Sequence, residues 1–277
     1  MAIRKMKPTT PGQRGMTSQD FSEITTKKPI KSLLKPMKRS SGRNHRGVIT
    51  SRRRGGGAKR HYRLVSFKLP ENFEAQVKEI EYDPNRSTRL ARLKTSEGSY
   101  HYILAPKNLR QGQTVKAGSS ADIENGHRLP LSKIPIGSLI HNLELRPGRG
   151  GQIVRSAGLS AQITAKDDKY AQVKLPSGEI RLFRLEAQAS LGVLGNEQHK
   201  NIKLGKAGRN RHKGRRPKVR GVATNPSDHP HGGGEGKRKG YKTPVTPWGQ
   251  PTLGYKTRPR RKSNRLIVRS RHLNKRK

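Results

Sequence analysis

Hydrophobic and polar residues alternate in short runs through the middle of the chain, beginning at His61. Side chains of successive strand residues point to opposite faces of a sheet, so this alternation predicts β-strands rather than helices. Turn residues separate the runs, as at 83–85 and 96–98. Short strands with tight turns favour a small closed barrel, and a five-stranded oligonucleotide-binding (OB) barrel is one such solution. The predicted strands of this first block are 62–67, 75–82, 88–94, 99–104 and 114–117.

A second block of alternating residues follows and predicts a second small β-barrel. Two runs of polar and turn-forming residues, 167–169 and 176–179, have the composition of hairpin turns. Helix signals are scarce, and only 185–191 could form about one helical turn. The predicted strands of the second block are 138–145, 152–156, 161–166, 170–175 and 180–185.

Both ends of the chain lack a helical or strand period, and Pro and Gly interrupt them repeatedly. One late apolar run, Leu266-Ile267-Val268, could form a short strand or pack on a neighbour. We therefore predict an all-β protein with irregular extensions. The predicted organisation is a basic N-terminal extension (1–60), a first small barrel domain (61–125), a second barrel domain (126–197) and a basic C-terminal extension (198–277).

The distribution of charge indicates the partner. The chain has 62 Lys and Arg against 18 Asp and Glu, a net charge of +44. Residues 1–60 carry +15 and residues 196–277 carry +22, whereas the longer centre carries only +7. Such self-repulsion does not stabilise a compact protein, so the extensions need a polyanion, and nucleic acid is the partner that this pattern indicates. We expect the extensions to be unfolded without it.

RNA fits this pattern better than DNA. Readers of duplex DNA usually present a helix to the major groove, and no amphipathic helix with a basic face is visible. Structured RNA is recognised by shape and backbone contacts, which suits small barrels with long irregular arms. A DNA-compacting protein remains an alternative that rests on net charge alone.

Several other classes of protein find little support. The chain has no cysteine, which excludes disulfides and thiolate metal sites. No apolar run approaches the length of a membrane span or a signal-peptide core, so we expect a cytoplasmic protein with no membrane partner. No P-loop, H-E-x-x-H or nucleophile motif stands out, so we expect no small-molecule substrate.

Glycine-rich basic clusters carry the main chemical signal. Glycine lets the backbone approach a phosphate closely, and arginine presents a planar fork that matches phosphate oxygens. The alternative is a flexible linker that carries solubilising charge. The predicted RNA-binding residues of the clusters are Arg52, Arg53, Arg54, Lys59 and Arg60, then Lys206, Arg215, Arg216, Lys218 and Arg220, and finally Lys237 and Arg238.

A loop at 225–236 contains Asp228, His229, His231 and Glu235. These residue types could bind a metal, or a histidine could act as a general acid or base, because imidazole titrates near neutral pH. A third interpretation is a tight loop wedged into RNA, with the imidazoles contacting nucleotides, and we favour it. The single tryptophan, Trp248, either packs locally or stacks on a base.

The motifs, taken in order, resemble the bacterial members of the ribosomal protein L2 family nearly from end to end. Those that carry the resemblance are Gly42-Arg43-Asn44, Arg54–Gly57, Glu81–Ser87, Tyr102–Pro106, Pro147–Gln152, Arg155–Gly158, Gly205–Gly208, Asn225-Pro226, Asp228–Gly236 and Pro244–Gly249.

The resemblance implies that 61–125 is an OB-fold RNA-binding domain and that 126–197 is an SH3-like barrel domain, with extensions threaded into large-subunit (23S) ribosomal RNA. It implies roles in subunit assembly, in association with the small subunit and in the integrity of the peptidyl transferase region. It also implies contacts with neighbouring ribosomal proteins and RNA binding by Arg86 and Arg155. His229 matches a position considered for catalysis, but the family's chemistry belongs to RNA, so we expect no enzyme. We expect no cofactor beyond Mg²⁺ associated with the RNA.

Overall fold

The computed structural model describes residues 3–234, 243–259 and 262–271. The chain forms two compact units. The first comprises Met1–Lys38, Lys59–Lys206 and Arg265–Lys277, and the second comprises Arg39–Ala58 and Ala207–Asn264. Among the described residues, every helix is too short or too polar to cross a membrane.

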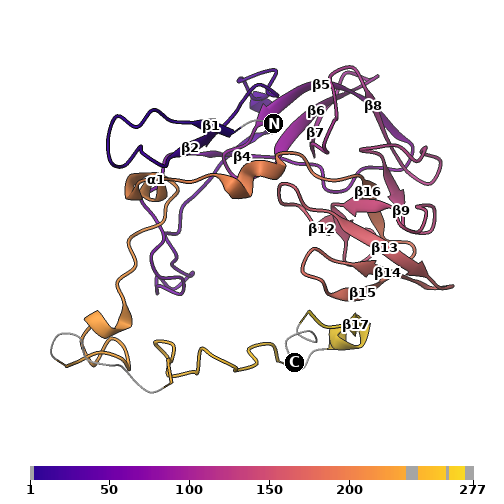
Figure 1. Cartoon of the computed structure of the whole chain (residues 1–277). Coiled ribbons are helices and arrows are strands. Elements are labelled where there is room, and N and C mark those ends of the chain that lie inside the picture. Colours follow the sequence, from indigo (N-terminus) through magenta and orange to yellow (C-terminus); the bar gives the residue numbers. More distant parts are fainter. Residues whose placement is uncertain (1–2, 235–242, 260–261, 272–277) are drawn as a thin grey trace. The chain divides into compact units, whose positions relative to one another are not determined.

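An eleven-stranded sheet dominates the first unit, which confirms the predicted all-β class (Figure 1). The strands lie in the order β17-β15-β14-β13-β10-β16-β9-β8-β5-β6-β7. Their bounds are β5 Phe73–Tyr82, β6 Arg89–Thr95, β7 Tyr100–Leu104, β8 Thr114–Ala117, β9 Arg128–Pro130, β10 Leu139–His141, β13 Ala161–Lys166, β14 Tyr170–Lys174, β15 Ile180–Arg184, β16 Gln188–Leu191 and β17 Ile267–Arg269.

The first block of strands is built around β5, which pairs antiparallel with both β6 and β8. Alternation along β5 buries Ala75 and Val77 and exposes Gln76 and Lys78, as the sequence pattern requires. The inward residues form a hydrophobic cluster that runs from Leu69 to Ala117. This block therefore has a hydrophobic core made from its own apolar residues.

The second block has a separate hydrophobic cluster, which draws its buried residues from 129–191. Antiparallel pairing joins β13 to β10 and β14, and β14 to β15. Hydrogen bonding continues between the two blocks, because β8 pairs parallel with β9 at Ala117 and Arg128. The two clusters consequently belong to one continuous sheet.

The predicted strand at 62–67 is wrong in length and in partner. Only β4 (His61–Arg63) forms, and it pairs with β3 (Leu34–Pro36) of the N-terminal extension in a separate two-stranded sheet. Beyond it, Val65 and Phe67 pack against a small cluster around Tyr102. Local alternation could not reveal that this packing, together with a hydrogen bond from the Ser66 N–H to the Tyr102 carbonyl at 2.8 Å, holds the segment without a continuous strand.

The predicted strand at 138–145 is broken into β10 and β11 (Leu143–Glu144). Asn142 lies between them with φ of 49°, a left-handed conformation that asparagine tolerates better than most residues. After the break, β11 pairs with β12 (Gly151–Ile153), while β10 stays in the large sheet. The predicted helical turn at 185–191 is also wrong, since β16 occupies most of it and buries Ala189 and Leu191.

The extensions contain short elements. In the first unit β1 (Ile3–Lys5) pairs with β2 (Thr17–Gln19). The late apolar run extends the large sheet as β17, which pairs with β15. The helices are α1 Ala207–His212 and the 3-10 turns Lys31–Leu33, Glu197–Asn201, Gly221–Ala223 and Lys262–Leu266.

In the second unit the two extensions pair with each other. Arg54 and Arg215 form an antiparallel bridge, and the Gly55 N–H donates to the Gly214 carbonyl at 3.0 Å. A Cβ on Gly57 would lie 2.7 Å from the Gly214 nitrogen, so only glycine allows this close approach. Segments predicted as separate arms are thus joined by backbone hydrogen bonds.

Candidate nucleic-acid interface

Two arginines from distant parts of the first unit meet at one aromatic ring. The Arg86 guanidinium carbon lies 5.2 Å from the centroid of Phe67 and 5.6 Å from that of Tyr62. The Arg155 guanidinium carbon lies 4.4 Å from the Phe67 centroid. At these distances cation–π attraction stabilises both guanidinium groups next to the aromatic rings. We call Tyr62, Phe67, Arg86 and Arg155 the Phe67 cluster.

A buried carboxylate orients Arg86. Asp83 is fully buried, and its Oδ2 accepts a hydrogen bond from Arg86 Nε at 2.9 Å. Its Oδ1 accepts from the Asn85 N–H at 2.9 Å, and it lies 3.5 Å from Arg63 Nη1. The Asp-Pro-Asn turn therefore forms as the sequence predicts, and the same carboxylate points the arginine across Tyr62 and Phe67.

Arg155 comes from the segment that follows β12 and remains exposed. Its Nη1 donates to the Gly151 carbonyl at 3.2 Å. Partial burial, with a smaller contribution from the positive charge of Arg86, lowers the pKa of Arg155. The positive charge of Arg86 thus disfavours the charged form of Arg155, and an approaching phosphate would relieve that repulsion.

A buried hydrogen-bond network around Tyr102 and Glu81 is linked to the Phe67 cluster. The Tyr102 hydroxyl donates to Glu81, whose oxygens both lie 2.9 Å away, and accepts the Ile30 N–H at 3.0 Å. Burial is the main cause that raises the pKa of Tyr102 to about 12 and that raises the pKa of Glu81. Arg63 contacts both Glu81 and Asp83, so this network is continuous with the carboxylate that holds Arg86.

The second unit has its own aromatic and basic group. The Arg52 guanidinium carbon lies 5.7 Å from the Trp248 ring centroid, and the Trp248 side chain is 73% exposed. Such exposure argues against Trp248 as a local packing anchor. An exposed indole with an arginine beside it is suited to stacking on a base.

Backbone donors fix the two histidines of the 225–236 loop. His229 Nδ1 accepts the His231 N–H at 3.0 Å, and His231 Nε2 accepts the Val245 N–H at 3.0 Å. The rings lie 4.7 Å apart, and the His229 ring packs on Gly221, where any Cβ would lie 2.7 Å from it. Desolvation, then His231 and Arg52, lower the pKa of His229. The Nδ1 of His229 is thus already occupied by a backbone donor.

The remaining predicted residues fall into three groups. Arg53 donates to the Val219 carbonyl at 2.9 Å within the second unit, and Arg60 donates to the Pro84 carbonyl at 3.0 Å within the first. Lys237, Arg238 and Glu235 lie outside the described residues. The exposed members are Arg54, Lys59, Lys206, Arg215, Arg216, Lys218 and Arg220.

Within the described residues no group of three or more His, Asp and Glu side chains could hold a metal ion. The metal interpretation of the loop included Glu235, which lies outside the described residues.

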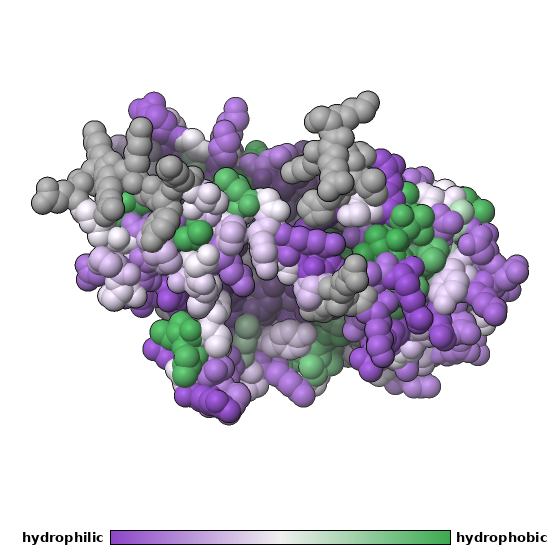
Figure 2. All heavy atoms as spheres, turned by 90° about the horizontal axis from the view of Figure 1, so that it is seen from below, coloured by the Kyte–Doolittle hydropathy of each residue, from purple (hydrophilic) through white to green (hydrophobic). Residues whose placement is uncertain are grey.

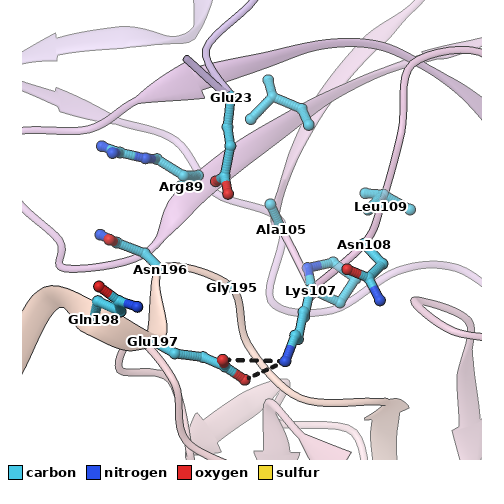
Figure 3. Close-up of a pocket in the computed structure, with 12 residues that line it drawn as sticks. Glu23, Arg89, Ala105, Lys107, Asn108, Leu109, Gly195, Asn196, Glu197 and Gln198 are labelled. Carbon is cyan, nitrogen blue, oxygen red and sulfur yellow. Dashed lines mark hydrogen bonds and ion pairs between the residues drawn. The ribbon is translucent and has the colours of Figure 1, made fainter. Parts of the chain in front are cut away.

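A cavity of about 240 Å³ lies in the first unit between 105–109 and 195–198. Figure 3 shows Glu23 and Glu197 entering it from opposite sides, and Glu197 pairs with Lys107 at 3.0 Å. The two carboxylates make it a poor phosphate site. Arg89 also lines it and is buried, with its guanidinium carbon 5.1 Å from the Phe21 ring. Sequence reasoning missed Arg89, because its burial depends on the N-terminal extension.

Hydrophilic residues cover most of the face shown in Figure 2, with hydrophobic residues in small patches.

Two family models match this chain. The model described as "Ribosomal Proteins L2, RNA binding N-terminal domain" matches residues 30–117. The model described as "Ribosomal Proteins L2, C-terminal domain" matches residues 124–249. The chain belongs to the ribosomal protein L2 family.

Membership of the L2 family makes the chain an RNA-binding protein of the large ribosomal subunit, with a role in translation. The N-terminal match covers β5 to β8, so this block is the OB-fold of the family. Tyr62, Phe67 and Arg86 lie within that match, and Arg155 lies within the other. The Phe67 cluster therefore joins side chains from both family domains.

Proposed function

We propose that this chain is a bacterial member of the L2 family and a non-enzymatic constituent of the large subunit that binds 23S ribosomal RNA. The proposal includes support of subunit assembly, association with the small subunit and integrity of the peptidyl transferase region. Its partners are ribosomal RNA, neighbouring ribosomal proteins and the small subunit in the cytoplasm. Mg²⁺ would enter only with the RNA.

The convergence of Arg86 and Arg155 on Phe67 is the observation that carries the proposal. Arg86 is held by Asp83 and by two aromatic rings, so little side-chain entropy remains to be lost on binding. Both arginines can present planar donors to phosphate oxygens. Because the two residues come from different family domains, an RNA bound there would recognise the relative placement of the two blocks within the first unit.

The extensions supply the second part of the mechanism. Residues 39–58 contain six arginines and no acidic residue. Cations of this density neutralise phosphates that would otherwise repel where RNA helices converge, and each neutralised phosphate releases counterions. The domain limits given above, 61–125 and 126–197 between two extensions, belong to this proposal, with the second domain as the SH3-like barrel.

Binding measurements on the full chain test the proposal. The affinity for fragments of protein-free large-subunit RNA is compared with that for an unrelated RNA of equal length, from about 50 mM to about 200 mM salt. We expect preference for the ribosomal fragments and roughly tenfold weaker binding when Arg86→Gln and Arg155→Gln are combined. The matched control removes two exposed arginines elsewhere in the first unit, Arg110→Gln with Arg184→Gln. Equal binding of the wild type to both RNAs at every salt concentration would refute the specific role.

A further inference from the structure

The loop between β11 and β12 presents two arginines that the proposed function has not used. Arg146 and Arg149 are exposed, and neither guanidinium group has a hydrogen-bond or ion-pair partner among the described residues. Between them, Pro147 and Gly148 occupy the centre of a turn in which the Arg149 N–H donates to the Arg146 carbonyl at 3.3 Å. Gly148 has φ of 75°, the value that position i+2 of a type II turn requires, and proline suits position i+1.

A buried carboxylate fixes the shape of this loop. Glu144 is fully buried and accepts the N–H groups of Gly148 at 3.1 Å and Gly150 at 2.9 Å. Arg128, also buried, donates to Glu144 at 2.9 Å. The negative charge of Glu144 is therefore neutralised inside the protein by Arg128, while the side chains of Arg146 and Arg149 are exposed to solvent. The segment 145–152 contains no acidic residue that could neutralise them.

The loop is also attached to the Phe67 cluster. The Gly151 N–H donates to the Phe67 carbonyl at 2.8 Å, and the Gly151 carbonyl accepts from Arg155. A Cβ on Gly150 would lie 3.1 Å from the Phe67 carbonyl oxygen, so the two backbones are in close contact. Arg149 is thus only two residues from a glycine that bonds both the ring residue and Arg155.

We infer that the turn carrying Arg146 and Arg149 is a phosphate-binding site that extends the Phe67 cluster along an RNA backbone. The inference rests on the proposed function and adds a site to it. A turn keeps its first and fourth Cα atoms within about 7 Å, so the two guanidinium groups can reach neighbouring phosphates of one strand. Glu144 already fixes the backbone of the loop in the absence of RNA. Binding therefore costs little further conformational entropy of the loop backbone.

The test removes the two charges and measures how binding depends on salt. The full-chain double variant Arg146→Gln with Arg149→Gln is titrated with the same large-subunit RNA fragments as the wild type. Loss of two phosphate contacts should reduce the magnitude of the negative slope of log K against log salt by about 1.4 to 1.8. It should also weaken binding about tenfold at physiological salt. Both residues are exposed, so the variant should keep the circular dichroism spectrum and melting temperature of the wild type.

Two comparison variants separate the possible outcomes. If the slope and affinity match those of Arg110→Gln with Arg184→Gln, the loop is not a phosphate site and the inference is overturned. In that case, loss of binding in Arg86→Gln with Arg155→Gln would leave the proposed function intact. If the wild type fails to prefer ribosomal fragments, the proposed function and this extension fall together. If the salt slope becomes shallower only in the Arg146→Gln/Arg149→Gln and Arg86→Gln/Arg155→Gln variants, the result supports both the proposed function and this phosphate-binding site.

Discussion

Breaking the buried Arg128–Glu144 pair by Arg128→Met should strongly destabilise the first unit. The Arg128 side chain is 1% exposed and that of Glu144 is fully buried. Besides the 2.9 Å contact with Glu144, Arg128 donates to the Asn142 carbonyl at 3.0 Å and to Gln188 Oε1 at 3.1 Å. Methionine fills similar volume, but it leaves a buried carboxylate without a counter-ion and two acceptors without their donor.

The expected magnitude follows from the uncompensated charge. Removing one partner of a buried pair typically costs about 3 to 5 kcal/mol. For a unit of this size, each kcal/mol shifts the melting temperature by about 2 to 4 °C, so Arg128→Met should lower it by roughly 6 to 20 °C. In the variant, the backbone N–H groups of Gly148, Gly150 and Gln188 still donate to Glu144. We therefore expect a fall in melting temperature towards the lower end of this range.

Urea and thermal unfolding of the full chain, followed by circular dichroism, measure the effect, with Arg110→Met as the exposed control. Adding Glu144→Gln to Arg128→Met should restore part of the lost free energy, because the double variant no longer buries an unpaired charge. Destabilisation by Arg128→Met within about 0.5 kcal/mol of the control would refute the reasoning, since that is the range of ordinary surface substitutions.

Two further predictions concern single side chains. Burial lowers the pKa of His141 to about 4 and outweighs the opposing effect of the hydrogen bond between its Nδ1 and the Gly192 carbonyl, so the native state holds it neutral near pH 6.5. The unfolded chain binds a proton below about pH 6.5, so stability should fall by about 3 kcal/mol as pH drops from 6.5 to 4. Urea unfolding at several pH values should show that fall in the wild type but not in His141→Gln, and identical profiles would contradict it. Trp248, the only tryptophan, should lose fluorescence when ribosomal RNA fragments bind, because a base stacks on its exposed ring. Unchanged emission at saturating RNA would show that no base stacks there.

The sequence predicted the strands whose stability depends on local alternation. The strands β8 and β13 have the predicted bounds, and β5 differs by two residues at its start. In these strands apolar residues face a core and polar residues face solvent, so the pattern contains the information needed. Asp83 and Asn85 likewise form their turn through their own side chain and backbone.

Other features depend on contacts between residues far apart in the chain, which no local pattern reveals. Arg128 and Glu144 appear as ordinary surface charges in the sequence, and only the packing of β9 against β16 and the break at Asn142 bury them together. Pairing of the two extensions at Arg54 and Arg215 is equally invisible, since both segments are read as flexible and basic. In the Phe67 cluster, the family resemblance indicated Arg86 and Arg155, but not that they share a ring.

Three buried acidic residues of this chain, Glu81, Asp83 and Glu144, each pair with an arginine side chain. The sequence has only 18 acidic residues, and these three are each no more than 1% exposed. Asp83 holds Arg86 against aromatic rings, and Glu144 holds the turn that carries Arg146 and Arg149. A carboxylate on the surface would both weaken the attraction for phosphate and compete for the same guanidinium groups. Burying it beneath an arginine-bearing turn avoids both effects, which favours the phosphate binding proposed above for these arginines.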